Sequence, residues 1–161
     1  MDSDTFVYTT YIRTTPEELW QALTEPELTR RYWGVSFETT WTPGASMVWD
    51  EAGRRTVDAD QVVLEARPGR LLSYTWHTFT PDWADAVRLE REVYERLVRE
   101  RRSRVTFVID PSGDTVKLTV THADLEPDGL MKGMIAEGWP ALISSLKSLL
   151  ETGEELPEPA R

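Results

Sequence analysis

The chain has 161 residues, 28 of them acidic and 18 basic, and its formal net charge is −10. A chain of this length usually builds one domain, and a hydrophobic content of 40% supplies a core, which argues against intrinsic disorder. The negative charge disfavours binding to nucleic-acid phosphates or anionic membranes, and the absence of cysteine excludes disulfides and thiolate metal sites.

A strand and two short helices are predicted first. Residues Phe6–Ile12 alternate between the two faces of a strand. The segment Thr15-Pro16-Glu17-Glu18 is typical of a helix start, with a capping threonine and proline at the first helical position. Because Thr24-Glu25-Pro26-Glu27 repeats this chemistry, a second helix is predicted, ending at Gly34.

Six further strands follow, separated by turns that contain glycine or proline, residues that favour the backbone angles of turns. They are predicted near Val35–Trp41, Ser46–Trp49, Ala59–Arg67, Leu71–Thr78, Arg104–Ile109 and Thr115–His122. Consecutive strands joined in this way predict an antiparallel meander.

Alternation predicts which strand residues face the core. Because the polar Glu65 and Arg67 must face water, their neighbours are expected to point inward: Val62, Leu64 and Ala66. On the last three strands the inward residues are Leu72, Tyr74, Trp76, Val105, Phe107, Ile109, Val116, Leu118, Val120 and His122. By the same rule His77 points away from the core, and Asp58 and Asp60 form a solvated edge.

A charged stretch interrupts the meander at about residues 80–103. Its apolar residues follow helical spacing, and Glu92–Arg96 and Glu95–Arg99 are favourable i,i+4 pairs, so one inserted helix is predicted near 84–102. We expect this helix to bury little area and to be a solvated surface helix, a lid or a dimer contact.

A long amphipathic helix near residues 130–152 closes the chain, with Pro140 either kinking it or starting its main part. Its buried stripe comprises Ile135, Trp139, Leu142, Leu146 and Leu149. Gly153 is the expected C-cap. The predicted domain therefore spans residues 1–153, and residues 154–161 form a flexible tail.

Four segments carry a family resemblance: PEELWQALTEPELTRRYWG, ARPGRLLSYTW, SRVTFVIDPSGDTVKLTVTH and EGWPALISSLKSLLETG. Together with the order of elements, they resemble the bacterial family homologous to the activator of the ninety-kilodalton heat-shock protein ATPase. This family belongs to the SRPBCC/START-like (Bet v allergen-like) superfamily, and the resemblance covers nearly all of residues 5–152. The charged insertion departs from it, since the family usually joins those strands by a short loop.

The resemblance implies an α+β helix-grip fold, in which an antiparallel six- to seven-stranded sheet wraps around the C-terminal helix and two short helices follow the first strand. It also implies a cavity between sheet and helix. Relatives in the superfamily bind lipids, sterols, polyketides or partner proteins, and a minority are cyclases or hydrolases. The fold therefore constrains function only weakly.

Aromatic residues and methionines are the candidates for lining this cavity, although such residues also fill ordinary cores. The predicted set is Trp33, Phe37, Tyr74, Trp76, Phe107, Met131, Met134 and Trp139. His122 joins it either as a polar group at the cavity mouth or as a core histidine with satisfied hydrogen bonds.

No catalytic residue, metal site or cofactor is predicted. The two histidines lack a metal-binding spacing, and Ser144-Ser145 lie within a helix rather than in a nucleophile motif. We expect a non-catalytic protein that binds an apolar or aromatic small molecule. The alternatives are a co-chaperone or stress-related interaction module, with a protein client or a second copy as its partner, and a cyclase- or hydrolase-like enzyme that uses His122 and Tyr74.

The first residues lack the charged and apolar regions of a signal peptide, and no apolar run approaches the roughly 18–20 residues that cross a bilayer. A cytoplasmic protein is predicted, without membrane insertion and without a nucleic-acid partner.

Overall fold

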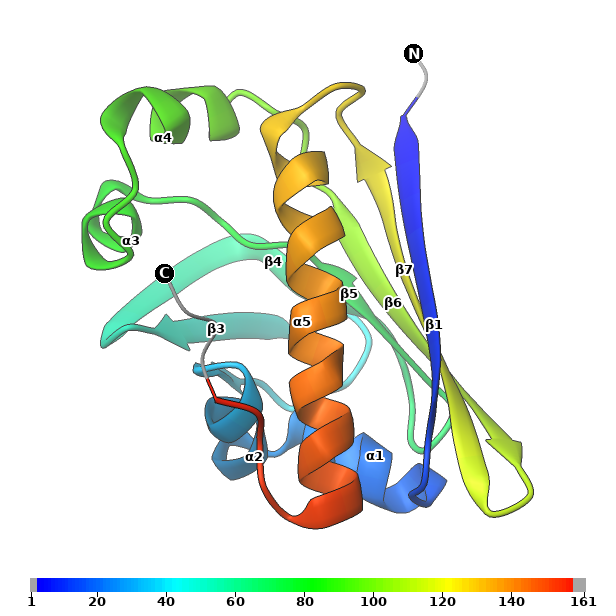
Figure 1. The fold of residues 1–161 in the computed structure, drawn as a ribbon. Coiled ribbons are helices and arrows are strands. Elements are labelled where there is room, and N and C mark those ends of the chain that lie inside the picture. Colours follow the sequence, from blue (N-terminus) through cyan, green and yellow to red (C-terminus); the bar gives the residue numbers. More distant parts are fainter. Residues whose placement is uncertain (1–2, 158–161) are drawn as a thin grey trace.

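A seven-stranded antiparallel sheet wraps around one long helix in the computed structural model, which describes residues 3–157 (Figure 1). The strands are β1 Asp4–Ile12, β2 Val35–Glu38, β3 Ser46–Glu51, β4 Arg54–Arg67, β5 Leu71–Thr75, β6 Arg104–Ser112 and β7 Thr115–Leu125. The helices are α1 Pro16–Thr24, α2 Pro26–Tyr32, α3 Pro81–Ala86, α4 Arg91–Leu97 and α5 Leu130–Thr152. The sheet order β1-β7-β6-β5-β4-β3-β2 confirms both the meander and the α+β helix-grip fold.

The helix α5 lies along the concave face of the sheet (Figure 1). It is continuous through Pro140, so its main part does not begin at this residue. Its core-facing residues are buried and include Ile135, Trp139, Ile143, Leu146 and Leu149. The helix ends at Gly153, whose φ of +85° is the left-handed conformation that glycine adopts without strain.

The two short helices begin where the sequence predicts. The Thr15 side chain accepts a hydrogen bond from the Glu18 amide and caps α1. After α2, Gly34 has a φ of +78° and turns the chain into β2. This turn leaves Trp33 between α2 and β2, in contact with both Phe37 and Trp139.

The inward orientation predicted for Val62 and Leu64 is wrong, because β4 is bulged. Val63 is fully buried, whereas Leu64 is 40% exposed and Val62 is only partly buried. The pairing of β4 with β5 shifts register between Val63 and Glu65, so the extra residue reverses the alternation. Beyond the bulge, Ala66 packs against the core as predicted.

The insertion forms two short helices, α3 and α4, rather than the one predicted. Arg88 has a φ of +57°, a conformation that ends α3 and that no helix interior contains. The expected pairs Glu92–Arg96 and Glu95–Arg99 are replaced by an ion pair between Arg91 and Glu95. The insertion also buries more than expected, since Trp83 is 7% exposed and Leu97 is fully buried.

The described part of the predicted tail, residues 154–157, contacts the helices. Glu155 pairs with Arg31 of α2, and the Leu156 amide donates to Ser145 Oγ of α5. The remaining tail residues, 158–161, lie outside the described residues. Over residues 3–157, no helix is both long and apolar enough to cross a membrane.

Candidate ligand-binding site

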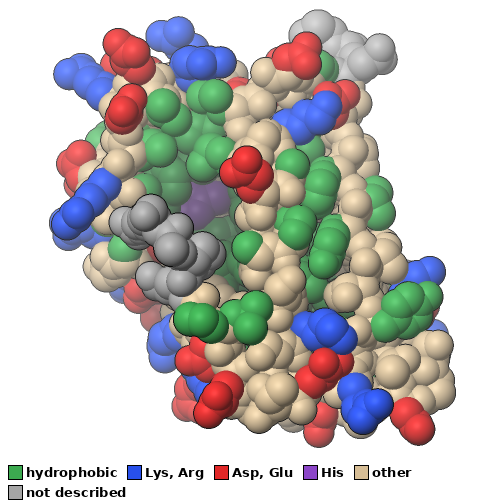
Figure 2. All heavy atoms as spheres, viewed as in Figure 1, with side chains coloured by type: hydrophobic (Ala, Val, Ile, Leu, Met, Phe, Trp, Pro, Cys, Tyr) green, Lys and Arg blue, Asp and Glu red, His purple; other side chains and the backbone are tan. Residues whose placement is uncertain are grey.

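A pocket of about 320 Å³ lies between α5, β3, the segment after β5 and α3. On this side of the molecule, apolar side chains gather in a hollow between the insertion and α5, with a histidine visible inside it (Figure 2). Its wall is mainly aromatic and comprises Trp33, Trp49, Trp76, Phe79, Trp83 and Trp139. The other lining residues are Val35, Glu51, His77, Met131, Met134, Ile135, Gly138 and Leu142.

The structure divides the predicted cavity residues into two groups. Five of the nine line the pocket: Trp33, Trp76, Met131, Met134 and Trp139. The other four lie in the core, each no more than 3% exposed: Phe37, Tyr74, Phe107 and His122. The second group therefore supports the pocket wall from behind, and direct contact with a ligand remains a prediction for the first group.

The aromatic wall is held by ring-to-ring packing. Trp33 stacks on Trp76 with ring centroids 6.0 Å apart and planes inclined by 17°. Trp76 also contacts Trp139 at 5.3 Å and meets Trp49 nearly edge-on at 5.3 Å. Because each ring is fixed by several others, the aromatic wall is preformed.

His77 lies in the pocket, which corrects the prediction that it faces away from the core. Alternation fails here because β5 ends at Thr75, so His77 follows the strand instead of belonging to it. The residue is 7% exposed, and its ring stacks on Phe79 at 5.3 Å and meets Trp49 at 4.6 Å. Both imidazole nitrogens are buried without a hydrogen-bond partner among residues 3–157, as is Trp49 Nε1.

A carboxylate stands beside this histidine. Glu51 Oε1 lies 3.5 Å from His77 Nε2, a distance that allows electrostatic attraction but is too long for a strong hydrogen bond. The same oxygen accepts a hydrogen bond of 2.8 Å from Trp83 Nε1. Burial opposes ionisation of Glu51, but the contacts with His77 and Trp83 outweigh it and hold the pKa of this carboxyl below its usual value.

His122 and Tyr74, the residues that the enzyme alternative would use, are both buried in the core. His122 is fully buried in the core rather than at the cavity mouth, and its Nδ1 accepts a hydrogen bond of 3.1 Å from Trp139 Nε1. Its Nε2 lies 2.7 Å from Ser103 Oγ, so both nitrogens are engaged. Burial lowers the pKa of His122 to about 4 and raises that of Tyr74 well above 10.

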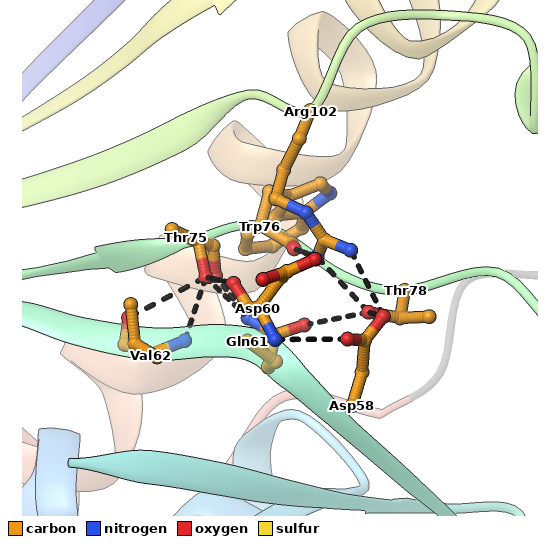
Figure 3. A network of polar contacts seen from close by, with 8 residues as sticks. All are labelled: Asp58, Asp60, Gln61, Val62, Thr75, Trp76, Thr78 and Arg102. Carbon is orange, nitrogen blue, oxygen red and sulfur yellow. Dashed lines mark hydrogen bonds and ion pairs between the residues drawn. The ribbon is translucent and has the colours of Figure 1, made fainter. Parts of the chain in front are cut away.

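Arg102 fastens the end of the insertion to β4 (Figure 3). Its guanidinium donates to the carbonyl of Trp76 and to Thr78 Oγ1, both at 2.9 Å, and to Asp58 Oδ2 at 3.1 Å. Asp58 is thus partly buried and paired with Arg102, whereas Asp60 is exposed as the alternation predicts. The hydrogen bond from the Asp60 amide lowers the pKa of Asp58, and Thr78 and Arg102 add to this effect.

Glu100, also at the end of the insertion, caps the N-terminus of α5. Its carboxylate accepts hydrogen bonds from the amides of Leu130 and Met131, at 2.6 and 3.2 Å. The N-cap residue is Gly129, and a Cβ atom there would lie 2.6 Å from Glu100 Oε1. Glycine is therefore required for the carboxylate to approach the helix end, where negative charge is also favoured by the helix dipole.

Nine pocket residues were not among the cavity residues predicted from the sequence: Val35, Trp49, Glu51, His77, Phe79, Trp83, Ile135, Gly138 and Leu142. A signal for part of this set was present, because Thr80 and Pro81 repeat the helix-start chemistry of Thr15 and Pro16 and place a short helix before the charged stretch. For Glu51 and His77 we find no such local signal. Among the described residues, no cluster of three or more His, Cys, Asp or Glu side chains is placed to hold a metal ion.

This architecture defines a class of protein, the helix-grip fold with an aromatic pocket between its sheet and its C-terminal helix. Within that class, residues 13–151 match the model of the family described as "Activator of Hsp90 ATPase homolog 1-like protein". The chain belongs to this family, as the sequence resemblance predicts. No curated protein is significantly similar to it.

Several solved structures share the fold. A protein from Mesorhizobium loti is 26% identical, with a TM-score of 0.67 over 91% of this chain and 96% of that one. The Aha1 dimer from Colwellia psychrerythraea is 17% identical, with a TM-score of 0.68 over 93% and 98%. CalU16 from Micromonospora echinospora is 15% identical, with a TM-score of 0.65 over 96% and 78%.

Proposed function

We propose that this protein binds an apolar aromatic small molecule in the pocket between α5, β3 and the insertion, without transforming it. The observation that carries the proposal is the composition of the pocket, in which six aromatic rings and five aliphatic or methionine side chains of β2 and α5 surround about 320 Å³. This volume is at the lower end of the range for small-molecule sites, and an apolar wall with few polar groups is typical of them. The fold family, whose members commonly bind hydrophobic ligands, agrees with it.

Methionines supply the adaptable side of the pocket. Met131 and Met134 lie on the first turns of α5, and Met134 is 41% exposed, which places it at the entrance. Their unbranched side chains adjust to a ligand at small energetic cost. The rigid tryptophans and flexible methionines together favour recognition by shape and stacking rather than by many hydrogen bonds.

Glycine at position 138 allows a direct test. Gly138 lines the pocket, and a Cβ atom built there meets nothing within 4 Å, so a larger side chain fits the backbone but enters the ligand space. We expect Gly138→Phe to weaken binding of the neutral fluorophore N-phenyl-1-naphthylamine by about tenfold or more. The measurement is a fluorescence titration of the probe against the purified protein.

Gly133→Phe is the matched control. Gly133 lies on the same helix and its Cβ would also meet nothing within 4 Å, but it is not part of the pocket wall. This variant should bind the probe like the original protein. Failure of the original protein to bind the probe at micromolar concentration, or equal weakening by both substitutions, would refute the proposal.

A second candidate is an interaction module, supported by the family description and by the dimer of the Colwellia protein. Under this alternative, the partner is a protein client or a second copy of the chain, and Gly138→Phe leaves assembly unchanged. Sedimentation velocity over a range of protein concentrations tests the homodimer. For either function we propose a cytoplasmic location.

A further inference from the structure

The polar end of the pocket contains a histidine and a carboxylate whose arrangement restricts what they can bind. His77 and Glu51 both line the pocket, and both are held by Trp83, which contacts the imidazole ring at 4.8 Å and donates to the carboxylate. The His77 side chain is only 5% exposed. These two residues are the ionisable side chains of the pocket wall.

The carboxylate determines which imidazole nitrogen carries the proton. An ionised Glu51 only accepts hydrogen bonds, and its Oε1 faces His77 Nε2. A neutral imidazole therefore carries its proton on Nε2, toward the carboxylate, and presents the lone pair of Nδ1 as an acceptor. The hydrogen bond from Trp83 Nε1 keeps the carboxylate in this position.

Nδ1 is then a buried acceptor without a partner among residues 3–157. Such groups are rare in folded proteins, because burying an unpaired polar atom costs free energy that a hydrogen bond recovers. His77 lines the pocket between the rings of Trp49 and Phe79, so a molecule bound among these aromatic side chains can supply the donor. A ligand with a carboxylate is disfavoured, since its charge would approach that of Glu51.

We infer that the ligand is an aromatic molecule that carries a hydroxyl group, and that this hydroxyl donates its hydrogen bond to His77 Nδ1. The inference rests on the proposed function, because it assigns the chemistry of a ligand in that same pocket. Glu51 acts as a positioning residue, which selects the imidazole tautomer without contacting the ligand.

The test compares two probes that differ at the hydroxyl group, 2-naphthol and 2-methoxynaphthalene. Each is titrated as a competitor of bound N-phenyl-1-naphthylamine. We expect 2-naphthol to bind about tenfold more tightly, which corresponds to one additional hydrogen bond to a buried acceptor. In His77→Phe, which keeps an aromatic ring but removes both nitrogens, the two affinities should lie within about twofold of each other.

Glu51→Gln provides an independent variant in case His77→Phe does not fold. The amide nitrogen of glutamine can donate to Nε2, which moves the imidazole proton to Nδ1 and removes the acceptor, so the preference for 2-naphthol should disappear here too. Glu95→Gln, an exposed position of α4, is the matched control and should keep the preference.

The outcomes separate the two proposals. If N-phenyl-1-naphthylamine itself does not bind the original protein, the proposed function fails. If it binds but the two naphthalenes compete equally well, only the hydroxyl assignment fails. If the preference exists and survives both His77→Phe and Glu51→Gln, a different group recognises the hydroxyl and the inference is overturned.

Discussion

Replacing His122 by glutamine should remove a large part of the acid sensitivity of the fold. His122 is fully buried between Ser103 and Trp139, and burial lowers its pKa from 6.5 to about 4. In the unfolded chain the imidazole titrates near its ordinary pKa. Between these two values, the unfolded chain binds a proton that the folded chain does not bind.

The sign and size of the effect follow from this difference. The stability contributed by a neutral, buried His122 is fully present above pH 6.5 and is lost as the pH falls toward 4. Each factor of ten in proton affinity corresponds to about 1.4 kcal/mol, so the total loss is about 3 kcal/mol. Glu51, Asp58, Glu151 and Glu155 have lowered pKa values as well, but their contributions are lost at still lower pH.

Urea titrations at several pH values between about 7 and 4 provide the measurement, with the free energy of unfolding of both proteins compared at each pH. The carboxylates are the same in both, so the difference between the curves isolates His122. We expect the original protein to lose about 3 kcal/mol more than His122→Gln over this range. Parallel curves would show that His122 is not buried as a neutral group, and the reasoning would be refuted.

Three further predictions concern packing and the insertion. Trp139→Ala should lower the free energy of unfolding by about 3–5 kcal/mol, because it empties a site of the aromatic core that is 2% exposed; denaturant titration checks this. Glu100→Ala should cost about 1–2 kcal/mol in the same assay through loss of the α5 cap, whereas Glu95→Ala, an exposed control, should change stability by less than about 0.5 kcal/mol. Arg102→Ala should accelerate hydrogen exchange in residues 81–97 relative to the central strands, and unchanged exchange would contradict its anchoring role.

Short-range rules predicted the elements whose structure is set locally. Thr15 and Pro16 begin α1, Gly34 and Gly153 end helices in the left-handed conformation, and the glycine and proline turns separate the strands. Each of these residues acts on its immediate neighbours, so the sequence alone contains the information. The stripe of α5 follows from its period in the same way.

The errors occur where structure depends on a partner strand. Nothing in the residues 62–67 themselves reveals that Glu65 pairs with Ser73 after a bulge, yet this register decides that Val63 is buried and Leu64 is exposed. Likewise, Arg88 ends α3 through a conformation that helix propensity does not predict for arginine. Pattern-based prediction assumes that alternation or helical period continues, and it fails where pairing or packing interrupts it.

The polar end of the pocket exists because the sheet stops early at this point. After Tyr74, the ladder between β4 and β5 gives way to side-chain hydrogen bonds from Gln61 to the Thr75 carbonyl and from the Val62 amide to Thr75 Oγ1. If β5 continued to Thr78, alternation would place His77 on the face opposite Trp76, away from α5. Because the chain instead leaves the sheet to form the insertion, His77 turns into the pocket beside Glu51. Most of the apolar wall therefore derives from the sheet, the end of α2 and α5, and the insertion adds Phe79 and Trp83. The hydrogen-bonding group depends on the insertion, so substitutions that alter it should affect which ligand is preferred more than whether an apolar ligand binds.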